Sequence, residues 1–181
     1  VITEMILRLI PKPEATGLML AAFPGLLAAS ETVSQIIAAR IIPSTLEFLD
    51  KHCIQAAEHH LKAGLPLDAE ALLLIQVDGP RDSIVPQLEQ IREVCRKRGA
   101  DPIRVAESPE EMSKLMMVRT SLANAILHIQ PTKINEDIVV PRSRIPQMIK
   151  RLQEIGDRWG HLIITFGHAG DGNLHVNVMT D

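Results

Sequence analysis

Two similar stretches of the sequence carry its strongest fold signal: Leu18-Met19-Leu20-Ala21-Ala22-Phe23-Pro24 and Leu72-Leu73-Leu74-Ile75-Gln76-Val77-Asp78-Gly79-Pro80. Each is an apolar run that ends in a turn containing Pro or Gly, and each is followed by a helical pattern and then by a further strand pattern. A duplicated β-α-β unit of this kind is typical of a ferredoxin-like layer. The sequence therefore predicts an α+β fold, in which ferredoxin-like β-α-β repeats form an antiparallel sheet with the helices packed on one face.

The remaining elements follow from the same two periodicities and from the Pro and Gly residues that interrupt them. We expect strands over residues 2–10, 17–23, 44–50, 70–77, 102–106, 137–141, 161–166 and 173–179. We expect helices over residues 26–40, 51–63, 83–98, 108–128 and 144–159. The helix from Ser108 has a clear start signal, because Ser caps helices and the acidic Glu110 and Glu111 favour a first turn. Arg119 lies on its polar face.

The composition excludes several classes of protein. With 46% hydrophobic and 23% charged residues, the 181-residue chain has the make-up of a globular domain rather than of a disordered segment. A net charge of -3 and the scarcity of aromatic residues, three Phe and one Trp, argue against a nucleic-acid partner. The sequence shows no membrane span or secretory signal, so we expect a cytoplasmic location. Cys53 and Cys95 form no CxxC pair and are expected to be reduced thiols.

The chemistry-bearing candidates lie in the last third of the chain. Gly167-His168-Ala169-Gly170-Asp171-Gly172-Asn173-Leu174-His175 consists of two strand ends joined by a loop of small residues, with a histidine at each shoulder. Two imidazoles placed in this way can converge on one point, and histidine is a common ligand of divalent metals, so the pattern indicates a two-histidine metal site. The spacing alone also fits an ordinary hairpin with an Asp-Gly turn and two incidental histidines.

The full string Gly-His-Ala-Gly-Asp-Gly-Asn-Leu-His-Val-Asn, residues 167–177, resembles the C-terminal domain of the FAD-linked oxidase family. This family includes D-lactate dehydrogenases, glycolate oxidase flavin subunits and D-2-hydroxyglutarate dehydrogenases. Residues 1–13 resemble the exit from the family's flavin-binding domain, and residues 133–146 resemble its bacterial glycolate oxidase branch. The resemblance covers essentially the whole chain.

The resemblance implies roles for individual residues. It implies that His168 and His175 bind a divalent metal, commonly zinc and in some relatives manganese or iron. It implies that Arg119 pairs with the substrate carboxylate, that Asn177 addresses the substrate and that Lys133 is a second cationic contact. The loop expected near the flavin comprises Gly170, Asp171, Gly172 and Asn173. The family's tryptophan-containing neighbourhood of the arginine is replaced here by Leu115-Met116-Met117.

The resemblance also implies a division into domains. Residues 1–13 are expected to be an exit strand and linker from an upstream FAD-binding domain, and residues 14–181 a substrate or cap domain truncated at its C-terminal end. An acidic metal ligand and a catalytic base are expected beyond Asp181. The sequence holds no GxGxxG or P-loop, so the FAD should be bound mainly by the upstream domain. Arg142 and Arg144 are expected to face solvent or that domain.

Two functions remain open at this stage. The first is the substrate- and metal-binding domain of an FAD-dependent enzyme that oxidises a D-2-hydroxy acid, glycolate or D-lactate, with hydride passing from the α-carbon to the flavin. The fragment alone would then be inactive, and the full complex would include companion electron-transfer subunits, peripheral at the inner membrane. The alternative is a non-redox relative or a metal-binding or assembly module that keeps the fold. The parent open reading frame would discriminate between them.

Overall fold

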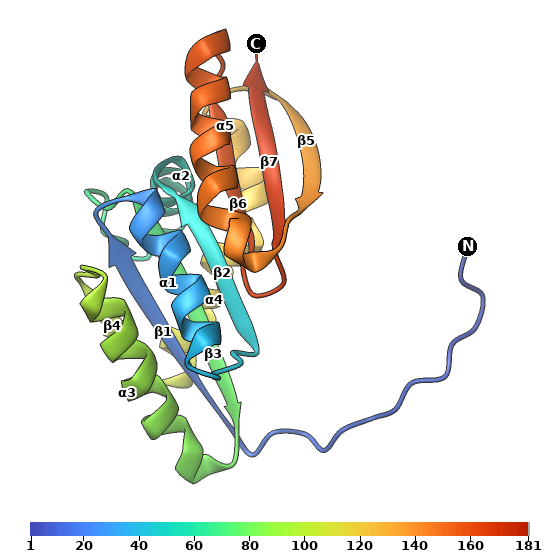
Figure 1. The fold of residues 1–181 in the computed structure, drawn as a ribbon, viewed down its shortest axis with the longest axis vertical. Coiled ribbons are helices and arrows are strands. Elements are labelled where there is room, and N and C mark those ends of the chain that lie inside the picture. Colours follow the sequence, from blue (N-terminus) through green and yellow to red (C-terminus); the bar gives the residue numbers. More distant parts are fainter. Residues whose placement is uncertain (181) are drawn as a thin grey trace.

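A computed structural model describes residues 1–180 and contains a seven-stranded sheet in the order β4-β1-β3-β2-β6-β7-β5, with every neighbouring pair antiparallel. The strands are β1 Ala15–Phe23, β2 Thr45–Asp50, β3 Ala71–Gly79, β4 Ile103–Val105, β5 Thr132–Val139, β6 Ile163–His168 and β7 Asn173–Thr180. The helices are α1 Leu26–Ala38, α2 Lys51–Leu61, α3 Arg81–Lys97, α4 Pro109–Ala125 and α5 Ile145–Trp159, with 3-10 turns at Ile126–His128 and Arg142–Arg144. The predicted α+β class and antiparallel sheet are confirmed (Figure 1).

The duplicated unit forms one half of the sheet. The repeats β1-α1-β2 and β3-α3-β4 interleave, so that β1 and β3 lie side by side from the pair Ala15 and Gly79 to the pair Phe23 and Ala71. The resulting order β4-β1-β3-β2 is that of a ferredoxin-like layer. The helices of the two repeats, α1 and α3, pack on the same face of the sheet, as the duplication predicts.

A second group of strands extends the sheet beyond β2. Strand β6 pairs with β2 over three residue pairs only, Glu47 with His168, Phe48 with Gly167, and Leu49 with Phe166. Strands β7 and β5 continue outward from β6, and α5 packs beside α1. The short β2–β6 ladder is therefore the junction between the repeated unit and the second unit.

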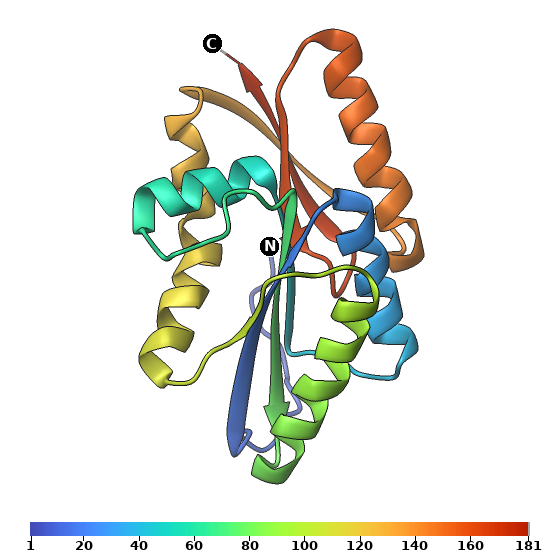
Figure 2. The same ribbon diagram turned by 90° about the vertical axis from the view of Figure 1, so that its left-hand side faces the viewer.

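The prediction that all helices lie on one face needs a correction. Helices α1, α3 and α5 cover one face, whereas α2 and α4 cover the other, as the edge-on view shows (Figure 2). In β1, the side chains of Met19 and Ala21 pack in the core under α1, α3 and α5, whereas those of Leu18 and Leu20 pack in the core under α2 and α4. The physical reason is in the sequence: a strand that is apolar at consecutive positions needs cover on both faces, because neither face tolerates water.

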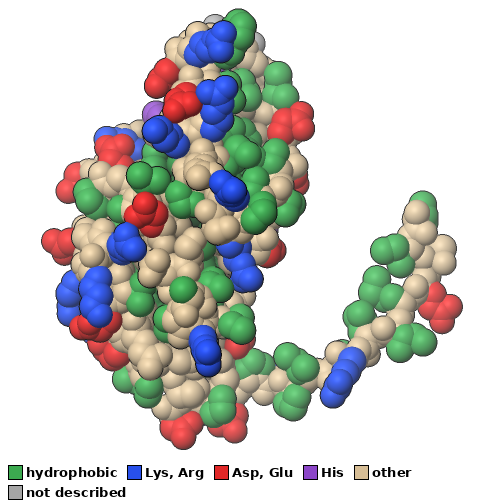
Figure 3. Space-filling view, in the orientation of Figure 1, with side chains coloured by type: hydrophobic (Ala, Val, Ile, Leu, Met, Phe, Trp, Pro, Cys, Tyr) green, Lys and Arg blue, Asp and Glu red, His purple; other side chains and the backbone are tan. Residues whose placement is uncertain are grey.

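Residues 1–14 form no helix or strand, so the strand predicted over residues 2–10 is wrong for the structure described. The segment extends away from the rest of the molecule and leaves its apolar side chains exposed (Figures 1 and 3). Its alternating pattern has no neighbouring strand to pair with among residues 1–180. A strand needs such a partner for its backbone hydrogen bonds, so the pattern alone does not produce one.

The other predicted elements are present; most boundaries differ from the prediction by one or two residues, and two differ by more. Strand β5 begins at Thr132 rather than at residue 137, because it is an edge strand whose exposed polar residues mask the strand pattern. Helix α4 ends at Ala125, and residues 126–128 form a 3-10 turn. No helix in the described part of the chain combines the length and the apolar character that crossing a membrane requires.

Both cysteines are free and buried, in agreement with the prediction of reduced thiols. Burial raises the pKa of Cys95 to about 12 and raises the pKa of Cys53 well above the ordinary thiol value. A thiol must lose its proton to act as a nucleophile, so these side chains serve as core residues.

Candidate functional site

The chemistry-bearing side chains come together on the sheet face that α2 and α4 cover. Successive residues of a strand point to opposite faces, and the buried neighbours Leu49, Ile164 and Met179 identify the face in β2, β6 and β7. Glu47 in β2 shares this face, and His168 in β6 lies directly opposite it in the β2–β6 ladder. In the β5–β7 ladder, Asp137 and His175 form an equivalent pair. Each histidine therefore has a carboxylate as its cross-strand neighbour.

The first carboxylate–imidazole pair is buried on the acid side. His168 Nδ1 lies 2.8 Å from Glu47 Oε1 and 3.0 Å from Oε2, and the Glu47 side chain is 7% exposed. A carboxylate accepts hydrogen bonds, so His168 Nδ1 carries the proton and donates it. In the neutral form of the ring, the second nitrogen, Nε2, then carries the lone pair.

Arg119 of α4 joins the same pair. Its Nε atom lies 2.8 Å from Glu47 Oε1, and its Nη2 atom lies 3.3 Å from His168 Nδ1. The Nε–H does not point along a hydrogen bond to the carboxylate, so the contact is an ion pair rather than an aligned hydrogen bond. Because His168 Nδ1 donates to Glu47, its contact with the guanidinium is a packing contact. Glu47 thus bridges the two predicted site residues.

A cavity of about 360 Å³ opens beside this cluster, at the end of the junction between β2 and β6. Its polar lining includes Ser44, Thr45, Glu47, Arg119, Arg142 and His168. Arg142 also donates from Nη1 to the carbonyl oxygen of Gly170, at 3.2 Å, although its side chain is exposed as predicted. The cavity therefore presents two guanidinium groups, of which Arg119 is paired with Glu47, and its lining also includes the carboxylate of Asp171. A guanidinium at the cavity wall is a group that can pair with a carboxylate.

The second carboxylate–imidazole pair lies next to the first. His175 Nδ1 is 2.6 Å from Asp137 Oδ1, and this hydrogen bond from His175 holds the pKa of the Asp137 carboxyl below its usual range. The rings of His168 and His175 are edge to face, with centroids 5.2 Å apart, and Phe166 packs against His175 at the same centroid distance. The structure brings the two predicted metal ligands together.

The two imidazoles meet one requirement of a metal site, the orientation of the rings, but not the usual number of ligands. A histidine that binds a metal usually donates its other ring N–H to a carboxylate, which is the arrangement of both His168 and His175. A third protein ligand is also usual. Among residues 1–180, however, no group of three or more His, Cys, Asp or Glu side chains is arranged to hold an ion. The described residues thus provide two oriented imidazoles and no complete ligand set.

The other two predicted substrate contacts do not line this cavity: Asn177 lies in the core, and Lys133 lies on the edge strand β5. Asn177 is fully buried two residues beyond His175, and its Nδ2 donates to the carbonyl oxygens of Ile164 and His175, at 3.3 Å each. Its Oδ1 atom is buried without a hydrogen-bond partner. Burying an unpaired acceptor costs free energy, so this atom calls for an explanation. Lys133 Nζ donates to the carbonyl oxygen of Ala123 near the end of α4, at 2.8 Å. Lys133 lies four residues from Asp137 along β5, which is about 13 Å.

The backbone N–H groups of the glycine-rich loop already have acceptors within the protein. The N–H groups of Gly170, Asp171 and Gly172 donate to carbonyl oxygens of Leu46 or His168, and the N–H of Asn173 donates to Asp171 Oδ1. Gly172 has φ +87, and a Cβ atom there would collide with the Val140 carbonyl oxygen. The glycines therefore allow a close approach of the chain to itself, and the loop offers the Asn173 Oδ1 atom, which has no partner, rather than a cradle of free N–H groups.

Glu47 and Asp137 were not singled out by the sequence analysis. A signal for Glu47 existed, because it is an acid inside the otherwise apolar strand Leu46-Glu47-Phe48-Leu49, and a buried acid needs a partner. Asp137 had no comparable signal, since an exposed acid on an edge strand is common.

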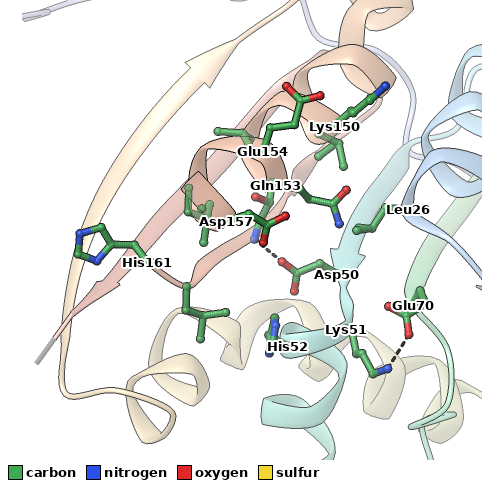
Figure 4. A pocket seen from close by; sticks show the side chains of 16 residues that line it. Leu26, Asp50, Lys51, His52, Glu70, Lys150, Gln153, Glu154, Asp157 and His161 are labelled. Carbon is green, nitrogen blue, oxygen red and sulfur yellow. Dashed lines mark hydrogen bonds and ion pairs between the residues drawn. The ribbon is translucent and has the colours of Figure 1, made fainter. Parts of the chain in front are cut away.

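A second cavity, of about 460 Å³, lies on the opposite face between α5 and the ends of β2 and β6 (Figure 4). Asp50 lies in it, where its carboxyl accepts hydrogen bonds from the backbone N–H groups of Cys53 and Thr165. Burial raises the pKa of Asp50, while these two hydrogen bonds act in the other direction. Lys51 and Glu70 form an ion pair at the rim. None of the predicted site residues lines this cavity.

The fold and the histidine-containing strand pair together define a class of protein. The family model described as FAD linked oxidases, C-terminal domain, matches residues 12–181, and the chain belongs to this family. The resemblance noted from the sequence is therefore confirmed.

Among its relatives, the glycolate oxidase subunit GlcD of Bacillus subtilis is 44% identical over all 181 residues, which make up 38% of that protein. GlcD of Escherichia coli is 33% identical over 181 residues, or 36% of its length. The D-lactate dehydrogenase of Anaerostipes hadrus is 30% identical over 97% of this chain and 38% of its own. The chain thus spans well under half the length of these relatives.

Solved structures agree on the fold. p-Cresol methylhydroxylase with substrate bound superposes with a TM-score of 0.70, at 10% identity, over 95% of this chain and 40% of that one. Alkyldihydroxyacetonephosphate synthase superposes with a TM-score of 0.66, at 12% identity, over 93% of this chain and 37% of that one. At these identities the likeness concerns the fold alone.

Proposed function

We propose that this chain is the substrate-side domain of an FAD-dependent oxidoreductase that oxidises a D-2-hydroxy acid, glycolate or D-lactate. The observation that carries the proposal is that Arg119 and His168 line one cavity, with the His175 ring packed edge to face against His168. The relatives of the chain are named glycolate oxidase subunits and D-lactate dehydrogenases. Hydride would leave the substrate α-carbon for the flavin. The isolated 181-residue chain is expected to be inactive.

Arg119 binds the substrate carboxylate in this proposal. A guanidinium matches a carboxylate with two parallel N–H donors, and Arg119 lines a cavity large enough for a small acid. Asn177 and Lys133 are the further substrate contacts. The buried, unpaired Oδ1 of Asn177 supports its role, since it is an acceptor in need of a donor. Lys133 would have to leave its hydrogen bond to Ala123 to reach a substrate near Arg119.

His168 and His175 would hold a divalent metal through their Nε2 atoms. Both rings are already oriented by carboxylates on Nδ1, as in many metal sites. When bound, a divalent metal supplies Lewis-acid activation, which lowers the pKa of a coordinated hydroxyl. Zinc suits imidazole ligands, and manganese and iron are the alternatives. The acidic third ligand and the catalytic base would come from residues outside this chain.

The FAD would be bound mainly by an upstream domain, with residues 1–13 as the connection to it and residues 14–181 as the substrate or cap domain. The exposed apolar side chains of the extended N-terminal segment support this division, because they lack cover in the structure (Figure 3). The loop formed by Gly170, Asp171, Gly172 and Asn173 would lie near the flavin. Companion electron-transfer subunits and a cytoplasmic location, peripheral at the inner membrane, complete the proposal.

The test is anaerobic flavin reduction in the full-length protein. Glycolate, D-lactate and L-lactate are each mixed with the purified flavoprotein, and the loss of flavin absorbance is followed. We expect rapid bleaching with glycolate or D-lactate and little with L-lactate. Full-length protein that binds divalent metal but is not bleached by any 2-hydroxy acid would overturn the proposal and would favour a metal-binding or assembly module.

A further inference from the structure

Glu47 is a buried acid that the proposed function does not use. It occupies the middle of β2, where its backbone is held on both sides, opposite Leu74 of β3 and opposite His168 of β6. Its side chain is 7% exposed and contacts two basic groups, Arg119 and His168. A buried carboxylate is expensive to keep unless its partners need it.

We infer that Glu47 is a positioning residue, which holds the Arg119 guanidinium in place and fixes His168 as the tautomer with its proton on Nδ1. The inference rests on the proposed function for the roles of Arg119 and His168. It assigns Glu47 no contact with substrate, since both of its oxygens already face basic groups of the protein.

The effect on Arg119 follows from side-chain freedom. An arginine side chain has many rotamers, and each substrate encounter would have to order them. The ion pair of Nε with Glu47 Oε1, at 2.8 Å, anchors the guanidinium to an inner strand of the sheet. The ordering is therefore completed before a substrate arrives.

The effect on His168 follows from hydrogen bonding. In a neutral imidazole one nitrogen carries the proton and the other carries the lone pair, and the partner of one nitrogen decides which. With both Glu47 oxygens within 3.0 Å of Nδ1, the proton stays there and Nε2 keeps its lone pair. A metal or a substrate proton requires that lone pair.

Charge and position make opposite forecasts for a variant. If Glu47 acted only through its negative charge, its removal would make the cavity more positive and would tighten the binding of an anionic acid. If Glu47 positions Arg119, its removal would weaken binding despite the gain in positive charge. The direction of the change in KM therefore separates the two roles.

The experiment uses two variants of the full-length flavoprotein, Glu47→Gln and Glu47→Met, with Glu31→Gln as the control. Glu31 pairs with Arg98 at 2.9 Å on the surface, so its variant also loses an Arg–carboxylate pair. Gln at position 47 keeps an acceptor for His168 Nδ1 but loses the charge that anchors Arg119. Met is similar in size and has no such acceptor. The readouts are KM and kcat for the preferred 2-hydroxy acid, and 15N spectra of labelled histidine at a pH of about 8.5, where an ordinary imidazole is neutral.

For Glu47→Gln we expect KM to rise about tenfold, with the His168 proton still on Nδ1. For Glu47→Met we expect the proton to move to Nε2 and kcat/KM to fall about tenfold further, while flavin content stays at the wild-type level. The control should match the wild type in both readouts. A fall in KM for Glu47→Gln, or a His168 proton on Nε2 in the wild type, would overturn the inference.

The histidine spectra do not depend on turnover. If the wild-type protein oxidises no 2-hydroxy acid, the proposed function fails, yet the tautomer of His168 in the wild type and in Glu47→Met still decides whether Glu47 positions that ring. If Glu47→Met does not fold, the wild-type spectrum and the KM of Glu47→Gln remain decisive.

Discussion

The Asp50 carboxyl accepts a hydrogen bond from the backbone N–H of Thr165, with Oδ2 and N 2.5 Å apart, across the junction between β2 and β6. Its other oxygen accepts from the N–H of Cys53 at 2.9 Å and so caps α2. The β2–β6 ladder has only three residue pairs, one of which is Glu47 with His168. A single buried side chain therefore supports both the junction of the two sheet halves and the register of the candidate site.

Replacing Asp50 should destabilise the whole domain. Asp50→Ala removes a helix N-cap and leaves two backbone N–H groups without their acceptor, so we expect a loss of about 2–4 kcal/mol in the free energy of unfolding. Chemical denaturation measures it. The control is Asp78→Ala at an exposed position in β3, which should change stability by less than about 0.5 kcal/mol. Equal losses in the two variants would show that the Asp50 hydrogen bonds do not matter.

Gly172 should not tolerate a side chain. Its positive φ of +87 and the nearby Val140 carbonyl oxygen leave no room for a Cβ atom, so Gly172→Ala must shift the loop between His168 and His175. We expect a loss of at least about 2 kcal/mol in the free energy of unfolding. Gly25→Ala is the matched control, because Gly25 has an extended backbone and open space around the position of a Cβ. A Gly172→Ala protein as stable as Gly25→Ala would contradict the loop geometry.

The parts of this fold that sequence could predict are those encoded locally. The duplicated apolar runs from residues 18 and 72 identify the repeats, and the histidine-containing string identifies the strand pair around His168 and His175. The role of Glu47 could not be predicted from the sequence, because its partner His168 is 121 residues away and the β2–β6 register that joins them is not a local property. The second helical face was also overlooked, although unbroken apolar strands require cover on both sides.

The start of α4 should respond to pH through Glu110. A hydrogen bond from its own backbone N–H and one from the Ser108 hydroxyl hold the pKa of Glu110 below its ordinary value. A depressed pKa in the folded state means that the stabilisation is present above the unfolded value of about 4.3 and is lost as the pH falls through the folded value. We expect wild type to melt at a higher temperature than Glu110→Gln at pH 7, and the difference in melting temperature to shrink as the pH falls below the ordinary pKa of a glutamate. A constant difference would exclude the charge as its cause.

Arg119 should be sensitive to a change that keeps its charge. In the full-length protein, Arg119→Lys retains a cation but loses the planar pair of donors. We therefore expect kcat/KM for the 2-hydroxy acid to fall roughly 10- to 150-fold, which corresponds to a loss of about 1.5–3 kcal/mol of transition-state stabilisation. Steady-state kinetics measures it. Arg98→Lys, which alters the surface pair with Glu31, should leave kcat/KM unchanged. An unchanged kcat/KM for Arg119→Lys would show that Arg119 does not bind the substrate and serves only as the ion-pair partner of Glu47.

The histidine pair can be separated from an ordinary strand pair by metal content. If His168 and His175 are ligands, His175→Ala in the full-length protein should lower bound divalent metal and turnover together, since two ligands on neighbouring strands act on one ion. Flavin content should stay near wild type, because flavin binding is assigned to the upstream domain. The measurement is elemental analysis beside flavin absorbance. His161→Ala, on the turn before β6, is the control and should change neither quantity.

An ordinary strand pair makes a different forecast for the same variants. His175→Ala would then lose its hydrogen bond to Asp137 and its packing on Phe166, with a small loss of stability, and would keep its metal content and turnover. The isolated chain adds a second condition, because two imidazoles without a third ligand should bind zinc only weakly. Equal metal content in wild type and His175→Ala would therefore exclude the metal site, while a parallel fall in metal and turnover at constant flavin would leave the carboxylate-oriented imidazoles as its ligands.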